Sequence, residues 1–434
     1  MKFHAWFQCF SGCGVRYGLD QIVYRCELCG GLLEVQHDVI ALKQRSAAEW
    51  KQLFDSRLGG VSGVWSKKEV VLPELEDTNV VSLGEGNSPL LESRLFAGHL
   101  GIEEIHIKQC GTSHTGSFKD LGMTVLVSMV NQIRSRVRAV VCASTGDTSA
   151  ALAAYCAAAG IPSIVLLPKD KVSVAQLIQP IANNAITISV DADFDGCMKI
   201  VQEITKDTSI YLANSMNSLR VEGQKTISFE IVQQMGWEVP DFVVVPGGNL
   251  GNVSAIGSGF LLMRDLGLIS RLPKLVCAQT ERANPLYRSY LEGFANLQPV
   301  AAGKTHATAI QIGNPVSFGK AVRALRATDG IVEQVTETEL VNACAEVDRF
   351  GFFNDPQTGV ALAATIKLVK TKAIPRLSRV VVISTAHGLK FAEFKTKFHQ
   401  GQLSETNPIL QNLPIQVPAE IPAVRSVIDG RIPA

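Results

Sequence analysis

From about residue 100 onward, the chain alternates between short runs of apolar, β-branched residues and longer alanine-rich runs with helical spacing. The apolar runs have the length of buried strands and cover 104–108, 139–142, 163–167, 185–190, 242–245, 274–278 and 380–383. Helical patterns lie between most of them, over 118–133, 149–159, 224–234, 337–350 and 359–370. Strands that alternate with helices predict parallel sheets covered on both faces, with ligands bound at the carboxyl edge of the strands.

The two ends of the chain depart from this alternation. Residues 1–75 carry three of the tryptophans and a cluster of cysteines, and we expect them to form an appended N-terminal region. Residues 401–434 contain five prolines, which predict an irregular tail lying over the surface or a partner subunit. Between them we expect a main catalytic region over 76–400, with a smaller α/β domain inserted at about 122–215.

Composition excludes several classes of protein. Lys and Arg number 41 against 40 Asp and Glu, so there is no basic excess for binding nucleic acid. A hydrophobic content of 46% excludes a disordered chain. The longest uncharged stretch, 148–168, is divided by Gly160 and Pro162, so we expect no membrane span. The first residues lack the pattern of a signal or transit peptide, which predicts a cytoplasmic protein.

A lysine stands in the first turn of a predicted helix, in the segment TGSFKD at 115–120. The positive end of the helix dipole and burial both lower the pKa of an ammonium group placed there. A lowered pKa suits Schiff-base chemistry, because only a neutral amine attacks a carbonyl. This segment alone equally allows a solvent-facing Lys119 that pairs with Asp120.

The segment PGGNLGN at 246–252 follows an apolar strand and precedes a helix. Its three glycines allow successive backbone N–H groups to converge, and the helix dipole attracts an anion, so the loop suits a phosphate group. Its spacing fits neither the dinucleotide fingerprint nor a Walker loop. A tight turn without a ligand is the alternative at this point.

Two further segments place hydroxyl groups at the ends of predicted strands. STGDT at 144–148 suits a bound carboxylate or phosphate, while Thr145 or Asp147 also suits a helix N-cap. STAHG at 384–388 follows the strand at 380–383, and its hydroxyl groups suit a hydrogen bond to a ring nitrogen.

Together these four segments resemble the fold-type II pyridoxal-phosphate enzymes, which share the fold of the tryptophan synthase β subunit. Within that group, the chain is most similar to the long, plant-type threonine synthases. NSMNSLR at 214–220, followed by EGQKT at 222–226, resembles the segment that receives the substrate phosphate in those enzymes. The resemblance runs over nearly the whole chain and implies two parallel-sheet α/β domains with the appended N-terminal region.

The resemblance also implies roles for individual residues. Lys119 is the expected catalytic lysine, which carries pyridoxal 5′-phosphate. The other expected cofactor-binding residues are Asp147, Gly247, Gly248, Asn249, Leu250, Gly251, Asn252 and Thr385. The expected substrate-binding residues are Ser144, Thr145 and Thr148 for the carboxylate, and Asn214, Ser215 and Arg220 for the phosphate.

Two of these roles carry an expectation about protons. A neutral hydroxyl at Thr385 is expected to leave the cofactor's pyridine nitrogen largely unprotonated. Short-form threonine synthases have Asn where this chain has Asp147. We therefore expect the Asp147 carboxyl group to be protonated beside the cofactor's phenolic oxygen, unless it turns away to cap the helix that begins at Ser149.

Four of the ten cysteines lie close together in the sequence, at Cys9, Cys13, Cys26 and Cys29. The spacing approaches that of a zinc ribbon, with a wider first pair, and we expect these cysteines to be ligands of a structural zinc. Free thiols are the alternative. These cysteines depart from the plant-type pattern.

The function implied by the resemblance is conversion of O-phospho-L-homoserine and water into L-threonine and phosphate, a carbon–oxygen lyase reaction that ends threonine biosynthesis. A homodimer is expected, and S-adenosylmethionine, an activator of plant-type relatives, is a candidate effector. The alternatives are a cysteate synthase acting on O-phosphoserine and sulfite, and a non-catalytic homologue that binds the cofactor. No nucleic-acid or membrane partner is expected.

Overall fold

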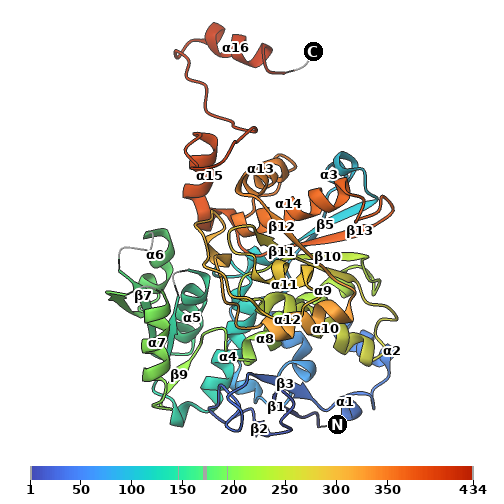
Figure 1. Ribbon diagram of the computed structural model, residues 1–434, viewed down its shortest axis with the longest axis vertical. Helices are drawn as coiled ribbons and strands as arrows, with labels where there is room; N and C mark the ends of the chain where they lie inside the picture. The colour runs from blue at the N-terminus through green and yellow to red at the C-terminus, as the bar shows by residue number, and fades with distance from the viewer. Residues whose placement is uncertain (1, 145, 170–173, 193, 433–434) are drawn as a thin grey trace.

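The largest sheet of the protein has six strands, most of which follow the apolar runs of the sequence. The computed structural model describes residues 2–144, 146–169, 174–192 and 194–432. The first five strands in spatial order run parallel, and the short edge strand β4 runs antiparallel to β5 (Figure 1). The order is β12 (Ile331–Val335), β11 (Lys274–Thr280), β10 (Phe242–Pro246), β13 (Arg379–Ser384), β5 (Glu104–Gln109) and β4 (Leu90–Glu92).

Helices cover both faces of this sheet because its central strands are apolar on both sides. In β10, Val243 and Val245 pack into one hydrophobic core, and Val244 packs into a second one. Helices α10 and α12 contribute side chains to the first core, and α13 and α14 contribute to the second. These helices are α10 (Gly251–Asp265), α12 (Phe318–Ala327), α13 (Glu337–Asp348) and α14 (Pro356–Lys370).

A second, four-stranded sheet is built from the middle of the chain, and all its strands are parallel. The two parallel sheets confirm the predicted fold class. Helix α5 ends just before Gly160, and β7 begins just after Pro162, as the sequence predicts. In the described part of the chain, no helix is both long and apolar enough to span a membrane. In order, the strands are β8 (Ile186–Val190), β7 (Ser163–Pro168), β6 (Ala139–Ala143) and β9 (Ile210–Leu212), accompanied by α5 (Asp147–Ala158), α6 (Val174–Ala182) and α7 (Phe194–Ile204).

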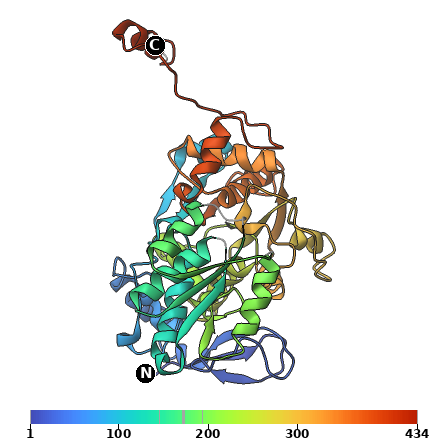
Figure 2. The ribbon, with the colours of Figure 1, turned by 90° about the vertical axis from the view of Figure 1, so that its left-hand side faces the viewer.

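The N-terminal region forms a small antiparallel sheet of its own, at the bottom of Figure 2. Its third strand is attached to the rest of the protein through polar contacts: the Leu33 carbonyl accepts hydrogen bonds from the Ser218 hydroxyl and from Lys320 Nζ, the latter at 2.6 Å. His37 Nε2 lies 2.6 Å from a Glu222 carboxylate oxygen. The elements are β1 (Ala5–Cys9), β2 (Arg16–Gly18), β3 (Leu33–His37), α1 (Val39–Leu42) and α2 (Ala47–Ser56).

Helix α4 (Lys119–Gln132) packs against α5 and against α8 (Leu219–Gln224), which is followed by α9 (Thr226–Gln234). The approach of α4 to α8 is close because each helix presents a glycine. A Cβ atom on Gly122 would lie 2.7 Å from the Arg220 carbonyl oxygen, and one on Gly223 would overlap the Leu121 carbonyl. This contact sets the start of α4 beside α8.

The sequence pattern misses several elements, including strands β9 and β12 and the helix α16 near the C-terminus. The tail follows the body of the protein as far as Asn412, whose N–H donates to His399, and then leaves it (Figures 1 and 2). The predicted irregular tail therefore contains a helix, and its last part does not lie on the surface of its own chain. The domain limits remain a prediction.

The remaining elements are α3 (Arg94–Leu100), α11 (Pro285–Leu291), α15 (Ala392–His399), α16 (Ile421–Asp429), and the short 3₁₀ turns Trp65–Val70, Asp77–Asn79, Cys110–Thr112, Arg134–Arg136, Thr308–Ile310 and Gly388–Phe391.

We predict that Gly223→Ala destabilises the protein by about 1–3 kcal/mol, the usual range for an overpacked core, because the new methyl group would force α4 and α8 apart. The matched control is Gly98→Ala in α3, where no atom lies within 4 Å of the added carbon. Alanine there should stabilise the helix by roughly 0.5–1 kcal/mol. Urea unfolding of both variants measures the change in the free energy of unfolding, and equal values for the two variants would contradict the close contact between α4 and α8.

Candidate active site

Three of the predicted loops meet because they follow three neighbouring strands. β10, β13 and β5 lie side by side and run parallel, so their carboxyl ends share one edge. The loops after β13 and β5 also bond directly, since the Phe118 N–H donates to the Thr385 carbonyl at 2.9 Å and Ser117 pairs with Ala386. Lys119 and Thr385 are thereby held at the same place.

Lys119 begins α4, and its Nζ lies 4.0 Å from the centre of the Phe118 ring. Burial and the positive charge of Arg220 lower the pKa of Lys119 to about 7, although Asp147 opposes the shift. The alternative pairing with Asp120 is not observed. Asp120 instead accepts hydrogen bonds from the hydroxyl and the N–H of Thr115, the latter at 2.7 Å. The Lys119 amine is therefore buried, with a lowered pKa and with Arg220 as a neighbouring charge.

The glycine loop after β10 fits a phosphate group. The N–H groups of Gly248, Asn249 and Leu250 donate to no other group in the described part of the chain. A Cβ atom on Gly248 would lie 2.9 Å from the Ile310 Cα atom, so only glycine leaves this path open. Leu250 has a positive φ of 64°, a strained conformation for a leucine, and Gly251 begins α10.

Asn252 gives an independent sign that a ligand belongs at this loop. Both polar atoms of its side-chain amide are buried and, among the described residues, have no hydrogen-bond partner. A buried amide without partners is unfavourable by about 1–3 kcal/mol. A bound phosphate oxygen would accept a hydrogen bond from the Asn252 NH2 group, so these residues fit the phosphate of pyridoxal phosphate.

The loop after β6 serves partly to cap α5. The Ser144 hydroxyl accepts hydrogen bonds from the N–H groups of Gly146 and Ser149, both at 3.3 Å. Thr148 Oγ1 lies 3.3 Å from Arg220 Nη2 and so faces the site. Thr145 lies outside the described residues.

Arg220 is a buried cation that pairs with no anion among the residues that the structure describes. It is 3% exposed, its Nη1 donates to the Ala213 carbonyl at 3.0 Å, and its Nη2 donates to Thr148. Its buried Nε has no hydrogen-bond partner in the part of the chain that the structure describes. Burial lowers the pKa of Arg220 to about 10. An unpaired guanidinium beside Lys119 is prepared for an anionic ligand.

The two residues predicted to bind phosphate with Arg220 lie in different surroundings. The side-chain amide of Asn214 makes two hydrogen bonds to the backbone of Ala143, at 3.0 and 2.8 Å, and so extends the sheet. Ser215 is partly buried at the start of the same segment. Asn214 therefore positions the segment through its pairing with β6.

Asp147 is the first residue of α5, two residues earlier than the sequence predicts, and it lies 3.2 Å from Lys390 Nζ. Lys390 also donates to the Thr115 carbonyl at 2.8 Å and to Gln179 at 2.7 Å. The lysine thus joins the Lys119 loop to α5 and α6 of the second sheet. Asp147 therefore has an ion-pair partner on the loop after β13, and its expected protonation stays a prediction.

Asp355 is a site residue that the sequence pattern did not single out. It is fully buried at the N-cap of α14, where its side chain accepts from the N–H groups of Gln357 and Thr358 at 2.9 and 3.0 Å. Both of its carboxylate oxygens also lie 3.3 Å from Thr385 Oγ1. An Asp directly before a Pro at a helix start is a recognised N-cap signal, and it could have marked this position.

The four N-terminal cysteines meet in space, with all their sulfur atoms within 4.8 Å of one another. Hydrogen bonding with Cys29 raises the pKa of Cys13 to about 12, while the backbone N–H of Cys13 helps to lower that of Cys9 to about 6. Four thiolates this close repel one another unless a cation lies between them.

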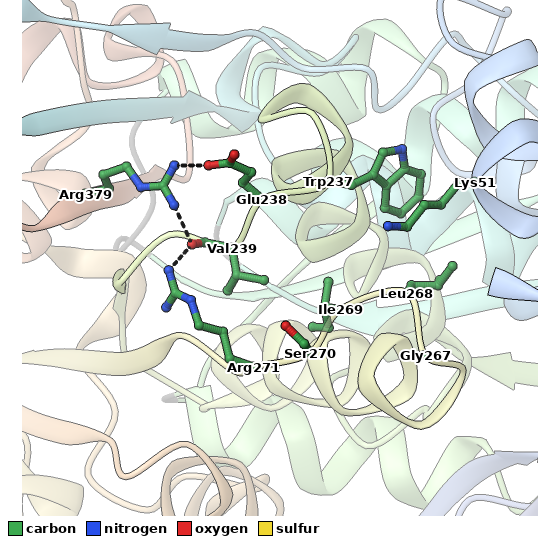
Figure 3. Close-up of a pocket in the computed structure, with 10 residues that line it drawn as sticks. All are labelled: Lys51, Trp237, Glu238, Val239, Gly267, Leu268, Ile269, Ser270, Arg271 and Arg379. Atoms are coloured by element: carbon green, nitrogen blue, oxygen red, sulfur yellow. Dashed lines mark hydrogen bonds and ion pairs between the residues drawn. The ribbon is translucent and has the colours of Figure 1, made fainter. Parts of the chain in front are cut away.

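A cavity of about 410 Å³ lies at the opposite edge of the large sheet (Figure 3). It is lined by residues just before β10 and β11 and by Arg379 at the start of β13. Its arginines are already engaged: Arg379 pairs with Glu238 at 2.5 Å, and Arg271 donates to the Val239 carbonyl. Because the cavity lies at the starts of these strands and not at their carboxyl ends, it is separate from the candidate active site.

Comparison with known proteins agrees with this geometry. Residues 81–386 match the family described as pyridoxal-phosphate dependent enzyme. The chain is 54% identical to threonine synthase 2, chloroplastic, of Arabidopsis thaliana over 95% of this chain and 82% of that protein. It is 42% identical to the threonine synthase of Methanocaldococcus jannaschii over 87% of this chain and 91% of that one.

Solved structures support the fold. The crystal structure of threonine synthase from Escherichia coli has a TM-score of 0.67 and covers 98% of this chain and 100% of its own, at 20% identity. Maize serine racemase has a TM-score of 0.62 at 17% identity, covering 79% of this chain and 99% of its own. At these sequence identities the comparison with solved structures shows the fold alone.

We predict that Arg220→Met raises the pKa of Lys119 above its value of about 7, because the substitution removes the nearby positive charge. In protein freed of cofactor, the rate at which acetic anhydride modifies Lys119 should then rise at a higher pH than in the wild type. Peptide mass spectrometry measures the rate. Arg264→Met, at an exposed position in α10, is the control and should leave the pH dependence of the modification rate unchanged. An unshifted profile for Arg220→Met would mean that burial alone acts on Lys119.

Proposed function

The chain belongs to the pyridoxal-phosphate-dependent enzymes and, within them, to the threonine synthases, and on this premise we propose that it converts O-phospho-L-homoserine and water into L-threonine and phosphate with Lys119 as the catalytic lysine. The observation that carries the proposal is Arg220, a buried guanidinium beside Lys119 and Thr148 that has no anionic partner in the described part of the chain. A substrate that bears both a carboxylate and a phosphate supplies the missing negative charge.

The residues divide between cofactor and substrate. Pyridoxal phosphate, when bound, withdraws electrons from the substrate's Cα and so makes its protons removable. Lys119 holds it through its amine, the loop 247–252 holds its phosphate, and Thr385 meets its ring nitrogen. Ser144, Thr145 and Thr148 bind the substrate carboxylate.

Lys119 then acts as the proton carrier. Its pKa of about 7 leaves part of the amine neutral at pH 7, so that it can take a proton from the substrate's Cα and then one from Cβ, and return protons to Cγ and Cα. Phosphate leaves from Cγ, and water adds at Cβ. Arg220 binds the leaving phosphate with its planar pair of N–H groups, while Asn214 and Ser215 hold the segment that presents it.

A cysteate synthase and a non-catalytic homologue are the competing functions. The anion-binding residues do not distinguish O-phosphohomoserine from O-phosphoserine, because both carry the same two anionic groups. Phosphate release measured with O-phosphohomoserine, and separately with O-phosphoserine plus sulfite, decides between them. Release only in the second assay, or in neither, would overturn the proposed function.

Lys119→Ala should abolish threonine formation while leaving a folded protein, because the removed amine is both the cofactor's anchor and the proton carrier. The visible absorption band of the lysine-bound cofactor should disappear and return only when a primary amine is supplied. Circular dichroism checks the fold. An alanine variant that still forms threonine would remove Lys119 from the mechanism.

Arg220→Lys should reduce kcat/KM almost as much as Arg220→Ala, because an ammonium group cannot make the paired contact with a phosphate. The expected loss is roughly 2–4 kcal/mol of transition-state stabilisation for a buried, charge-assisted contact. Arg264→Lys is the matched control and should keep full activity. A fully active Arg220→Lys enzyme would show that the guanidinium is not a phosphate ligand.

We also propose that the N-terminal cysteines bind a structural zinc. Cys9 and Cys29 sulfurs lie 3.5 Å apart, and the Gly31 N–H donates to Cys29 Sγ at 3.4 Å. Gly30 has a positive φ of 68°, and its N–H donates to the Cys26 carbonyl at 2.7 Å. This tight turn, with an N–H directed at sulfur, is suited to a zinc knuckle.

Elemental analysis should find about one zinc per chain in protein purified without chelator, and less in Cys29→Ser. Zinc removal should raise KM for O-phosphohomoserine, because the N-terminal sheet contacts the segment that carries Arg220. Protein without metal and with four titratable N-terminal thiols would favour free cysteines.

Assembly, regulation and location are further proposals that depend on the relatives. We propose a homodimer, which sedimentation velocity tests, and activation by S-adenosylmethionine, which the phosphate-release assay tests directly. A cytoplasmic location also remains a prediction, since the Arabidopsis relative is described as chloroplastic.

A further inference from the structure

The ammonium group of Lys390 joins loops of the large sheet to helices of the second sheet. Lys390 lies in the short turn after β13, and its Nζ donates to the Thr115 carbonyl at 2.8 Å and to Gln179 Oε1 at 2.7 Å. The Asp147 carboxylate lies 3.2 Å from the same Nζ. These three acceptors match the three donors of an ammonium group. Each of them comes from a different element: the loop after β5, α6 and the start of α5.

This contact is built into the fold and is not a surface ion pair. The side chains of Lys390 and Asp147 are 18% and 10% exposed. Gln179 Nε2 donates to the same Thr115 carbonyl at 3.1 Å, which closes the network. Gly116 has a positive φ of 83°, and a Cβ atom there would lie 3.0 Å from Lys390 Cδ, so this glycine leaves room for the lysine side chain. Largely buried, charge-assisted hydrogen bonds hold their partners more firmly than exposed ones.

One end of the network is fixed next to the catalytic lysine. The N–H and the hydroxyl of Thr115 both donate to the Asp120 carboxylate, the N–H at 2.7 Å. Asp120 directly follows Lys119 in the first turn of α4. The Thr115 carbonyl, which accepts from Lys390, is therefore held in a fixed position relative to Lys119.

The other end of the network is the loop that is proposed to bind the substrate carboxylate. Asp147 lies within this loop, 144–148, and is also the first residue of α5. The Ser144 hydroxyl accepts hydrogen bonds from the N–H groups of Gly146 and Ser149, so the loop and the first turn of α5 are joined. A force on Asp147 is therefore passed to the whole loop.

The next residue of α5, Thr148, contacts a second cation, Arg220, at 3.3 Å. The two contacts differ in what happens when substrate binds. A phosphate group bound to Arg220 competes with Thr148 for that guanidinium, whereas the contact between Asp147 and Lys390 needs no substrate group. Lys390 is therefore the contact that can hold the start of α5 while Arg220 binds an anion.

We propose that Lys390 is a positioning residue for the substrate carboxylate, because it sets the distance between the loop 144–148 and Lys119. Lys390 acts through Asp147 on the carboxylate loop and through Thr115 on the Lys119 segment. The inference rests on the proposed function for the identity of the substrate. Loss of the ammonium group should weaken binding of the carboxylate end of the substrate and spare phosphate binding at Arg220.

The test compares a carboxylate ligand with a phosphate ligand in the holoenzyme of Lys390→Met. L-2-Aminobutyrate has an amine and a carboxylate but no phosphate, and its binding is followed by the visible absorption band of the cofactor. Its dissociation constant should rise roughly tenfold or more, the size expected for lost hydrogen bonds to a charged group. KM for O-phosphohomoserine should rise as well, while the inhibition constant of inorganic phosphate should stay unchanged.

Two further variants complete the test. Lys397→Met, which removes an exposed lysine of α15 that pairs with Glu393, is the matched control and should leave all three constants unchanged. Gln179→Leu removes one partner of the same ammonium group and should raise the dissociation constant of L-2-aminobutyrate by a smaller factor. It keeps the proposal testable if Lys390→Met does not fold.

Unchanged affinity for L-2-aminobutyrate in Lys390→Met, or in Gln179→Leu if the first variant does not fold, would overturn the proposal. An equal loss of affinity for L-2-aminobutyrate and for phosphate would also overturn it, because a general disturbance of the structure would then be the cause. A wild-type enzyme that releases no phosphate from O-phosphohomoserine would instead count against the proposed function, and the titration with L-2-aminobutyrate would still test Lys390.

Discussion

The parallel pairing of β10, β13 and β5 is the constraint on which the site depends. Because the three strands are neighbours and run the same way, the glycine loop, Thr385 and the Lys119 loop all emerge at one edge. The hydrogen bond from the Phe118 N–H to the Thr385 carbonyl then fixes two of these loops to each other. Segments more than 250 residues apart in sequence are thereby held in one place by the backbone alone.

The second constraint is electrostatic. Arg220 is buried with no anion beside it in the described residues, and removing a charge from water without a partner is unfavourable by several kcal/mol. Glycines let α4 and α8 approach closely, which places the Arg220 backbone against the start of α4. The same contact places the positive charge near Lys119 and, together with burial, lowers the pKa of that amine to about 7. One packing contact thus prepares both the anion site and the proton carrier.

Much of this site could be predicted from the sequence, because the signals that mark its residues lie in short, continuous segments. Lys119, the loop 247–252 and Thr385 each stand at a recognisable strand end or helix start, so a short pattern identifies them. Lys390 and Asp355 could not be assigned in this way, because their partners, Asp147 and Thr385, lie far from them in the sequence. Asn214 was assigned to the phosphate on its pattern, but its amide is occupied by the backbone of Ala143, a contact between strand ends that no local pattern contains. The fold class followed from the alternation of elements, while the short strand β9 and the helix α16 were too weakly patterned to detect.

The N-terminal sheet acts on the same electrostatic centre from the other side. His37, Glu222 and Lys225 form a buried cluster in which the Lys225 ammonium and the Glu222 carboxylate pair directly. Burial and Lys225 lower the pKa of His37, so the histidine is neutral and its Nε2 lies beside the pair without adding charge. Glu222 and Lys225 follow Arg220 on the chain, and Ser218, which donates to the Leu33 carbonyl, precedes it. Because His37 contacts Glu222 and the Leu33 carbonyl accepts from Ser218, the N-terminal sheet is attached to the Arg220 segment on both sides of the guanidinium. The appended region is therefore a structural support for the phosphate-binding residue.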